Sequence, residues 1–173
     1  MSRPISLRAS ALCWLILSVL VIVLDQITKA AVIAALQPYV PHPVIPGFLN
    51  WTLAFNTGAA FSFLNDQAGW QRWLFATLAV IVSAVLTRWL ATIPRGDWRN
   101  AVPLALVIGG ALGNLIDRVR FGQVTDFIEV YYGAWSFPAF NVADSAISVG
   151  AALLLWFGLF GGGKKRFNAD SAN

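Results

Sequence analysis

Four long apolar stretches dominate the pattern of hydrophobic and polar positions along this 173-residue chain. They cover about residues 11–36, 73–93, 100–119 and 141–160. Each has roughly the 20 residues that a helix needs to cross the hydrocarbon core of a bilayer. The pattern therefore predicts an all-α membrane protein with four transmembrane helices, built as a single membrane-embedded domain over residues 1–173.

The two longer connections, residues 37–72 and 120–140, have a different pattern. Four early prolines prevent regular helix in the first connection. Residues 47–64, after these prolines, are rich in aromatic residues, Thr, Asn and Gly, as is typical of short strands and turns. Residues 65–73 fit a short amphipathic interfacial helix, and residues 124–132 fit another strand. We expect a small β-rich cradle and a short interfacial helix outside the membrane.

The distribution of charge predicts the topology. Only 12% of the residues are charged, against about 25% in a soluble domain. Basic residues lie near the N-terminus, beside the turn between the second and third spans, and in the tail, whereas residues 37–69 have none. The positive-inside rule therefore places both termini in the cytoplasm and both long connections outside, with Arg72, Arg118 and Arg120 as exceptions. The net charge of +4 reflects this topology, so we expect no nucleic-acid partner.

The first apolar stretch begins like a cleavable signal peptide, with a basic start and an apolar middle. The next residues are Asp25-Gln26-Ile27-Thr28-Lys29 rather than a small-residue cleavage site. We therefore expect a retained transmembrane helix.

Composition also limits the chemistry. Cys13 is the only cysteine and His42 the only histidine, so the chain cannot form an internal disulfide and lacks the ligands that zinc sites usually recruit. With one histidine and one cysteine, the chain also has few residues for a Cys–His or Ser–His–Asp site. We expect no metal and no cofactor, and any catalysis must rely on other polar side chains.

Ionisable groups within apolar spans are costly and need an explanation. Asp25 and Lys29 are four residues apart, so they share a helix face and can pair. Gly109 and Gly113 form a GxxxG pattern that favours close helix packing, and Asp117 ends the same stretch. A self-neutralising pair and a packed helix end are adequate structural interpretations of these groups.

Asp126 and Asp144 are harder to explain as structural residues. Asn141 is a good N-cap for the fourth helix, and an acid in its first turn favours the helix dipole, which by itself would account for Asp144. However, Ser145 and Ser148 extend a polar stripe from Asn141 and Asp144. If the third and fourth helices are neighbours, Asp126 and Asp144 would meet at the outer surface.

Two carboxylates at close range share a proton, because they cannot both ionise readily. The ionised member can take a proton from water, and the protonated member can polarise a carbonyl and then protonate the leaving amine. This is the chemistry of an aspartic peptidase, and it needs no metal, histidine or cysteine.

Five blocks of sequence together resemble the bacterial lipoprotein signal peptidase family, signal peptidase II. The blocks are Asp25-Gln26-x-x-Lys29, Asn56-Thr57-Gly58-Ala59-Ala60-Phe61, Gly109-Gly110-Ala111-x-Gly113-Asn114-x-x-Asp117-Arg118, Val124-x-Asp126-Phe127 and Phe140-Asn141-x-Ala143-Asp144-Ser145. Their order, their spacing and the four spans extend the resemblance over nearly the whole chain.

The resemblance implies an intramembrane aspartic endopeptidase that cuts diacylglyceryl-modified prolipoproteins just before the lipidated lipobox cysteine. It implies that the catalytic pair is Asp126 and Asp144. Substrate-binding or site-shaping roles are implied for Asn56, Gly110, Asn114, Arg118, Asn141 and Ala143, and structural support is expected from Asp25, Lys29 and Asp117.

The expected location is the bacterial inner membrane, with the active site near the periplasmic face and in contact with membrane lipids. We expect a monomer, although the GxxxG pattern fits dimerisation as well as packing within one chain. Two other functions remain open. A small transporter or channel predicts polar residues through the full membrane depth, and a non-catalytic lipoprotein-binding scaffold predicts that Asp126 and Asp144 are dispensable.

Overall fold

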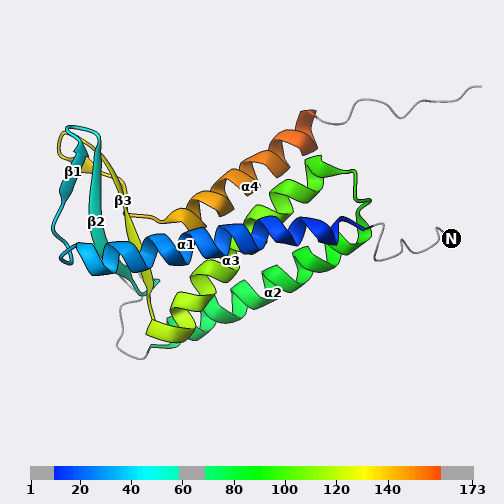
Figure 1. Cartoon of the computed structure of the whole chain (residues 1–173), viewed down its shortest axis with the longest axis horizontal. Helices are drawn as coiled ribbons and strands as arrows, with labels where there is room; N and C mark the ends of the chain where they lie inside the picture. Colours follow the sequence, from blue (N-terminus) through cyan, green and yellow to red (C-terminus); the bar gives the residue numbers. More distant parts are fainter. Residues whose placement is uncertain (1–9, 59–68, 161–173) are drawn as a thin grey trace, which may run out of the picture.

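A computed structural model of the chain describes residues 10–58 and 69–160. Its four long helices are α1 (Leu15–Ala35), which a 3-10 turn precedes, α2 (Trp70–Thr92), α3 (Trp98–Phe121) and α4 (Val142–Phe160). All four are long and apolar enough to cross a membrane. The predicted fold class is confirmed, and the helices lie together as a bundle with a small sheet at one end (Figure 1).

Helix α3 is the centre of the bundle, because it packs against α1, α2 and α4. Its glycines permit this close approach. A Cβ atom added to Gly109 would lie 2.8 Å from Cβ of Val21 in α1, and one added to Gly110 would collide with the carbonyl oxygen of Ala143 in α4. The predicted close packing of α3 is therefore present, and its partners are helices of the same chain.

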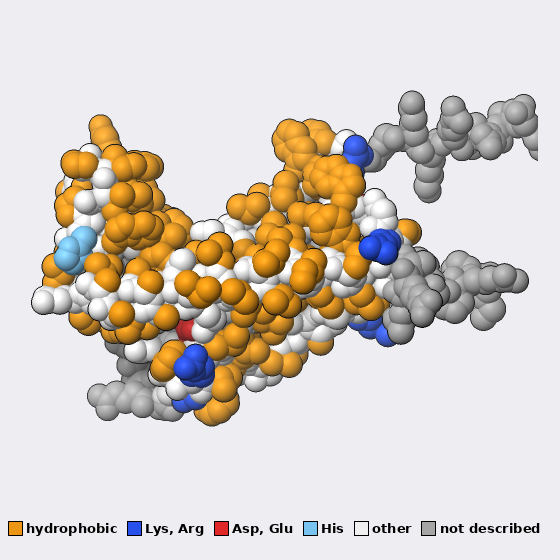
Figure 2. All heavy atoms as spheres, in the orientation of Figure 1, with side chains coloured by type: hydrophobic (Ala, Val, Ile, Leu, Met, Phe, Trp, Pro, Cys, Tyr) orange, Lys and Arg blue, Asp and Glu red, His pale blue; other side chains and the backbone are white. Residues whose placement is uncertain are grey.

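The outward faces of the helices are apolar, as the bilayer requires. Side chains such as Ile16, Leu20, Ile81 and Leu155 are more than half exposed. Figure 2 shows hydrophobic atoms over much of the visible bundle, whereas lysine and arginine gather towards its two ends. The described chain starts and finishes at the end of the bundle that lies away from the sheet (Figure 1).

The sheet has four antiparallel strands in the order of the chain: β1 (His42–Ile45), β2 (Leu49–Asn56), β3 (Val124–Tyr132) and β4 (Trp135–Ser136). Strand β3 has the predicted bounds. Strand β1 lies in the proline-rich segment, where the sequence predicted only the absence of helix. Prolines are tolerated there because β1 is an edge strand.

The pairing of β2 with β3 places the candidate residues Asn56 and Asp126 on neighbouring strands, two positions apart in register. Ala54 lies opposite Asp126, and Asn56, at the end of β2, lies opposite Val124. The register shifts between Trp51 and Ala54. Asn56 is thereby brought next to the part of β3 that carries Asp126.

Several predicted ends shift. Helix α2 begins at Trp70, so residues 70–73 of the expected interfacial helix form its first turn. Residues 65–68 of that expected helix lie outside the described residues. Helix α3 extends two residues beyond its predicted range at each end, from Trp98 to Phe121. The α3 end is set by Gly122, whose left-handed conformation (φ 80°) is typical of a helix C-cap.

Candidate active site

A cluster of buried charges joins α1 to α3. The ammonium of Lys29 lies 2.8 Å from Oδ2 of Asp25 and 3.0 Å from Oδ2 of Asp117. It also donates to Oδ1 of Asn114 at 2.9 Å, so all three of its hydrogens have a partner. The predicted pairing of Asp25 with Lys29 is present, and Asp117 is a second acid on the same cation. All four side chains are buried.

The amide of Gln26 completes this cluster. It donates to Oδ1 of Asp117 at 2.9 Å, and it lies 3.2 Å from Oδ2 of Asp25 and 3.3 Å from the carbonyl oxygen of Gly113. Sequence reasoning assigned Gln26 no role of its own, although it lies between the paired Asp25 and Lys29. Its position in that motif was the only available signal.

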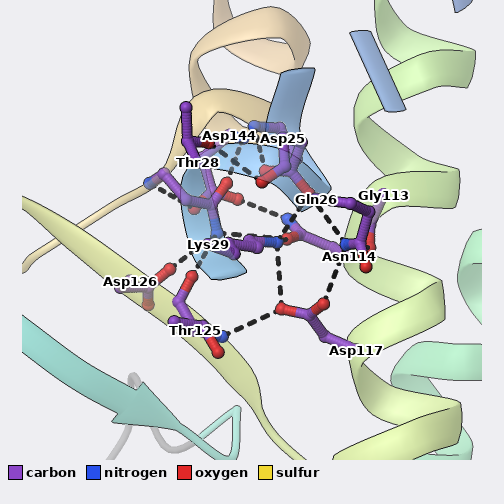
Figure 3. A network of polar contacts seen from close by, with 12 residues as sticks. Asp25, Gln26, Thr28, Lys29, Gly113, Asn114, Asp117, Thr125, Asp126 and Asp144 are labelled. Atoms are coloured by element: carbon purple, nitrogen blue, oxygen red, sulfur yellow. Dashed lines mark hydrogen bonds and ion pairs between the residues drawn. The ribbon is translucent and has the colours of Figure 1, made fainter. Parts of the chain in front are cut away.

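Each acid of the cluster also binds a backbone N–H on a neighbouring element (Figure 3). Thr125 in β3 donates to Oδ2 of Asp117 at 3.0 Å. Ala143 in the first turn of α4 donates to Oδ1 of Asp25 at 3.0 Å. These two anchored residues directly precede Asp126 and Asp144.

Asn141 connects the two remaining carboxylates. Its buried side-chain amide donates to Oδ1 of Asp126 at 2.7 Å, and it is close enough to Oδ1 of Asn114 (3.1 Å) and to the carbonyl oxygen of Thr125 (3.2 Å) to share its hydrogens with them. Its side-chain oxygen accepts the N–H of Asp144 at 2.8 Å. One side chain thus fixes β3 against the start of α4.

Asn141 and Asp144 also cap α4. In return for the N–H of Asp144, the Asp144 carboxylate accepts the backbone N–H of Asn141 at 3.3 Å. This reciprocal arrangement is a capping box. The other oxygen of Asp144 accepts the amide of Asn114 at 2.7 Å. Asp144 therefore caps α4, as expected, and is also part of the polar site.

Burial and the nearby charge of Asp144 raise the pKa of Asp126 to about 7. Hydrogen bonds from the amides of Asn56 and Asn141, and the charge of Lys29, oppose this rise in pKa without cancelling it. Asp126 therefore exchanges a proton near neutral pH. The structure brings Asp126 and Asp144 into one site from different elements.

Asn56 reaches Asp126 from a tight turn at the end of β2. Its side-chain oxygen accepts the N–H of Gly58 at 2.8 Å, which leaves its NH₂ group to donate to Asp126. Gly58 has a positive φ of 94°, a conformation that favours glycine. The turn therefore orients the Asn56 amide.

Among the described residues, open grooves reach both carboxylates. Asp144 lines one of about 300 Å³ between α2, α3 and α4, together with Asn114 and Arg118, and a second of about 500 Å³ along α4. Asp126 lines a third, of about 390 Å³, beside Asn56. A ligand can therefore reach Asp144 from the helical bundle and Asp126 from the sheet.

The other candidate residues lie around the same point. Arg118 lies over the ring of Phe75, with Cζ 5.2 Å from the ring centroid. Gly110 and Ala143 form the tight contact between α3 and α4 beside Asp144. In contrast, His42 and Cys13 are exposed, on β1 and at the start of the chain.

Residues 17–160 match the family model described as signal peptidase (SPase) II. The chain is 57% identical over 157 residues to the lipoprotein signal peptidase of Xanthomonas campestris pv. campestris (strain 8004), covering 91% of this chain and 94% of that protein. It is 55% identical over 151 residues to the lipoprotein signal peptidase of Xylella fastidiosa (strain M12), covering 87% and 89%.

Solved structures show the same architecture. A bacterial membrane enzyme determined by the in meso method at 1.9 Å resolution has a TM-score of 0.72 and 32% identity, over 86% of this chain and 93% of that one. A second such enzyme, at 2.3 Å resolution, has a TM-score of 0.73 and 31% identity, over 89% and 92%. With its four apolar helices and a family match over most of its length, the chain belongs to the signal peptidase II family of membrane aspartic peptidases.

Proposed function

We propose that this protein removes the signal peptides of diacylglyceryl-modified prolipoproteins by hydrolysing the peptide bond before the lipidated cysteine, with Asp126 and Asp144 as its catalytic pair. The family match and the named relatives support the activity. The assignment of the pair rests on Asn141, which bonds to both residues at the point that the open grooves of the described structure reach.

Asp126 is the member of the pair that holds the proton in the resting enzyme. Its raised pKa keeps a large protonated fraction at neutral pH. Asp144 is then ionised and takes a proton from the attacking water, while Asp126 donates to the carbonyl oxygen of the scissile bond. When the carbon–nitrogen bond breaks, Asp126 passes its proton to the amine of the cysteine, and Asp144 keeps the proton from water, so the pair again holds one proton.

The surrounding residues hold the pair in place. The amides of Asn56, Asn114 and Asn141 orient the two carboxylates through their hydrogen bonds. Gly110 and Ala143 allow α4 to approach α3, and Arg118 lines the groove that leads to Asp144. Asp25, Lys29 and Asp117 support the site from beneath without contacting substrate.

The protein is a multi-pass inner membrane protein. Its sheet end faces the periplasm and both termini lie in the cytoplasm, in accordance with the basic residues near the other end of the bundle. A substrate anchored by its signal helix and acyl chains then reaches the grooves by lateral diffusion in the bilayer. A monomer is sufficient, since the glycines of α3 are used within the chain.

The two other functions considered from the sequence lack support. The relatives from Xanthomonas and Xylella are lipoprotein signal peptidases rather than channels or scaffolds. The amides of Asn114 and Asn141 also hold the two carboxylates in one site at the sheet end.

The proposed substrate is tested with purified protein in detergent and a peptide that carries a lipobox. Cleavage is followed by mass spectrometry on two forms of the peptide, with and without a diacylglyceryl group on the cysteine. We expect cleavage before the cysteine in the lipidated form only. Equal rates on both forms would show that the enzyme does not require the lipid. If neither form is cleaved, the proposed activity is wrong.

A further inference from the structure

Phe75 in α2 touches two different parts of the candidate site. Its ring contacts Gly58, in the turn that follows β2, and it also lies beneath Arg118 of α3. The same side chain lines the groove that reaches Asp144. Phe75 thus connects α2 with residues on two other elements.

The contact with Gly58 is tight. A Cβ atom added to Gly58 would lie 2.5 Å from Cε2 and 2.7 Å from Cδ2 of the Phe75 ring. The ring edge therefore presses against the backbone whose N–H binds the side-chain oxygen of Asn56. Because that bond decides which end of the Asn56 amide faces Asp126, the ring fixes the amide indirectly.

The contact with Arg118 supports a positive charge next to the carboxylates. Cζ of Arg118 lies 5.2 Å from the centroid of the Phe75 ring, within the range of a cation–π interaction. Within the described residues, the hydrogen bond that this guanidinium donates is a long one, 3.4 Å to the carbonyl oxygen of Asn114. The ring is therefore a principal support of the guanidinium in the groove.

We propose that Phe75 is a positioning residue for the reaction: its ring holds the Asn56 amide against Asp126 and the Arg118 guanidinium beside Asp144. It acts through these two groups rather than on the scissile bond. This inference rests on the proposed function and adds a residue to its machinery.

The test compares Phe75→Leu with Phe75→Tyr on the lipidated peptide, measuring kcat, KM and the pH dependence of kcat/KM. Leucine removes the flat ring, so we expect kcat to fall by about tenfold or more, the scale of a misplaced catalytic group. The alkaline limb of the pH profile should also move to higher pH, because the Asn56 bond that lowers the Asp126 pKa is weakened. Tyrosine keeps the ring and should restore both properties.

None of the variants removes the other charged groups that face Asp126. They are Asp144, Lys29 and Arg118. A moved pH limb therefore reports the Asn56 amide and the placement of these groups, which a loss of general packing would not shift. A rise in KM alone, with kcat and the pH limb unchanged, would reduce Phe75 to a wall of the groove and overturn the proposal.

Two further variants complete the experiment. Phe121→Leu is the matched control, since Phe121 also lies beneath an arginine (Arg120, 5.0 Å) but is exposed and outside the groove; it should behave as wild type. Gly58→Ala adds a methyl group that would displace the Phe75 ring. It should move the alkaline limb to higher pH, as Phe75→Leu does. It therefore provides the test if Phe75→Leu does not fold.

The catalytic role of Asp126 and the positioning role of Phe75 are tested separately. If Asp126→Asn cleaves the peptide normally, the proposed catalytic pair is wrong, whatever Phe75 does. If Asp126→Asn is inactive while Phe75→Leu retains the wild-type kcat and pH profile, only the role of Phe75 is wrong.

Discussion

The carboxylate of Asp117 accepts the backbone N–H of Thr125 at 3.0 Å, and so holds the residue directly before Asp126. The same arrangement recurs on the other side, where Asp25 accepts the N–H of Ala143, directly before Asp144. Lys29 binds both supporting acids. One buried ammonium therefore fixes the two backbone segments that carry the proposed catalytic pair.

Replacing Lys29 with methionine should strongly destabilise the protein. The change leaves Asp25 and Asp117 buried together without their cation, and breaking a buried ion pair in this way costs about 3–5 kcal/mol. Thermal unfolding in detergent should show a clear loss of Tm. Arg88→Met is the control, because Arg88 is a cation on α2 outside this cluster and should unfold like wild type. An unchanged Tm for Lys29→Met would contradict the supporting role of the cluster.

Replacing Gly110 with alanine should separate α3 from α4. The new methyl group would collide with the carbonyl oxygen of Ala143, so the first turn of α4 and Asp144 must move. We expect lower Tm and a loss of cleavage of about a hundredfold, the effect of a displacement near 1 Å. Gly158→Ala is the matched control in α4, where an added Cβ meets nothing within 4 Å. Equal behaviour of the two variants would rule out the tight α3–α4 contact.

Activity should depend on the protonation of the catalytic pair. Because Asp126 must hold a proton to polarise the carbonyl, and its pKa is raised to about 7, kcat/KM should fall as the pH rises through about 7. The measured limb belongs to the pair, since the charge of Asp144 contributes to the raised pKa of Asp126. A pH–rate profile on the lipidated peptide checks this. Constant activity up to about pH 9 would show that no such proton is needed.

The raised pKa also predicts a dependence of stability on pH. The folded protein binds the Asp126 proton more tightly than the unfolded chain, whose aspartates have a pKa near 4. This contribution to stability is complete below about pH 4 and is lost as the pH rises to about 7. Asp126→Asn should lack this loss, so the difference in Tm between the variant and the wild type should shift in favour of the variant as the pH rises from about 4 to about 7.

Glu129 sets the background for that comparison. Hydrogen bonds, chiefly from Thr52, lower its pKa, so its contribution has the opposite sign and is lost on acidification. Glu129 is present in both proteins, so its contribution cancels in the difference between their Tm values. A difference that stays constant with pH would contradict the raised pKa.

The local features of this chain could be predicted from its sequence, and the long-range ones could not. The spans follow from apolar length, β3 from its run of β-formers, and the Asp25–Lys29 pair from helical spacing. The roles of Gln26 and Asp117 depend on contacts between α1 and α3, about 90 positions apart. No periodicity reports such contacts.

The same limit applies to Asp126 and Asp144. The sequence predicts their proximity only if helices α3 and α4 are neighbours, whereas in the structure β3 is joined to the start of α4 by the bridge between Ile128 and Phe140 and by the bonds of Asn141. Strand β1 was missed for a different reason. Its prolines argue against a central strand, and only the finished sheet shows that it lies at an edge.

The assignment of the hydrolysis to Asp126 and Asp144 can be tested directly by replacing each with asparagine. The measurement is the rate at which purified Asp126→Asn and Asp144→Asn cleave the diacylglyceryl-modified lipobox peptide, with Tm and membrane insertion checked in parallel. Asparagine keeps the shape of each side chain but can neither hold nor take the required proton. We predict folded, inserted proteins whose cleavage is abolished, whereas wild-type cleavage by either variant would contradict the catalytic role of that residue.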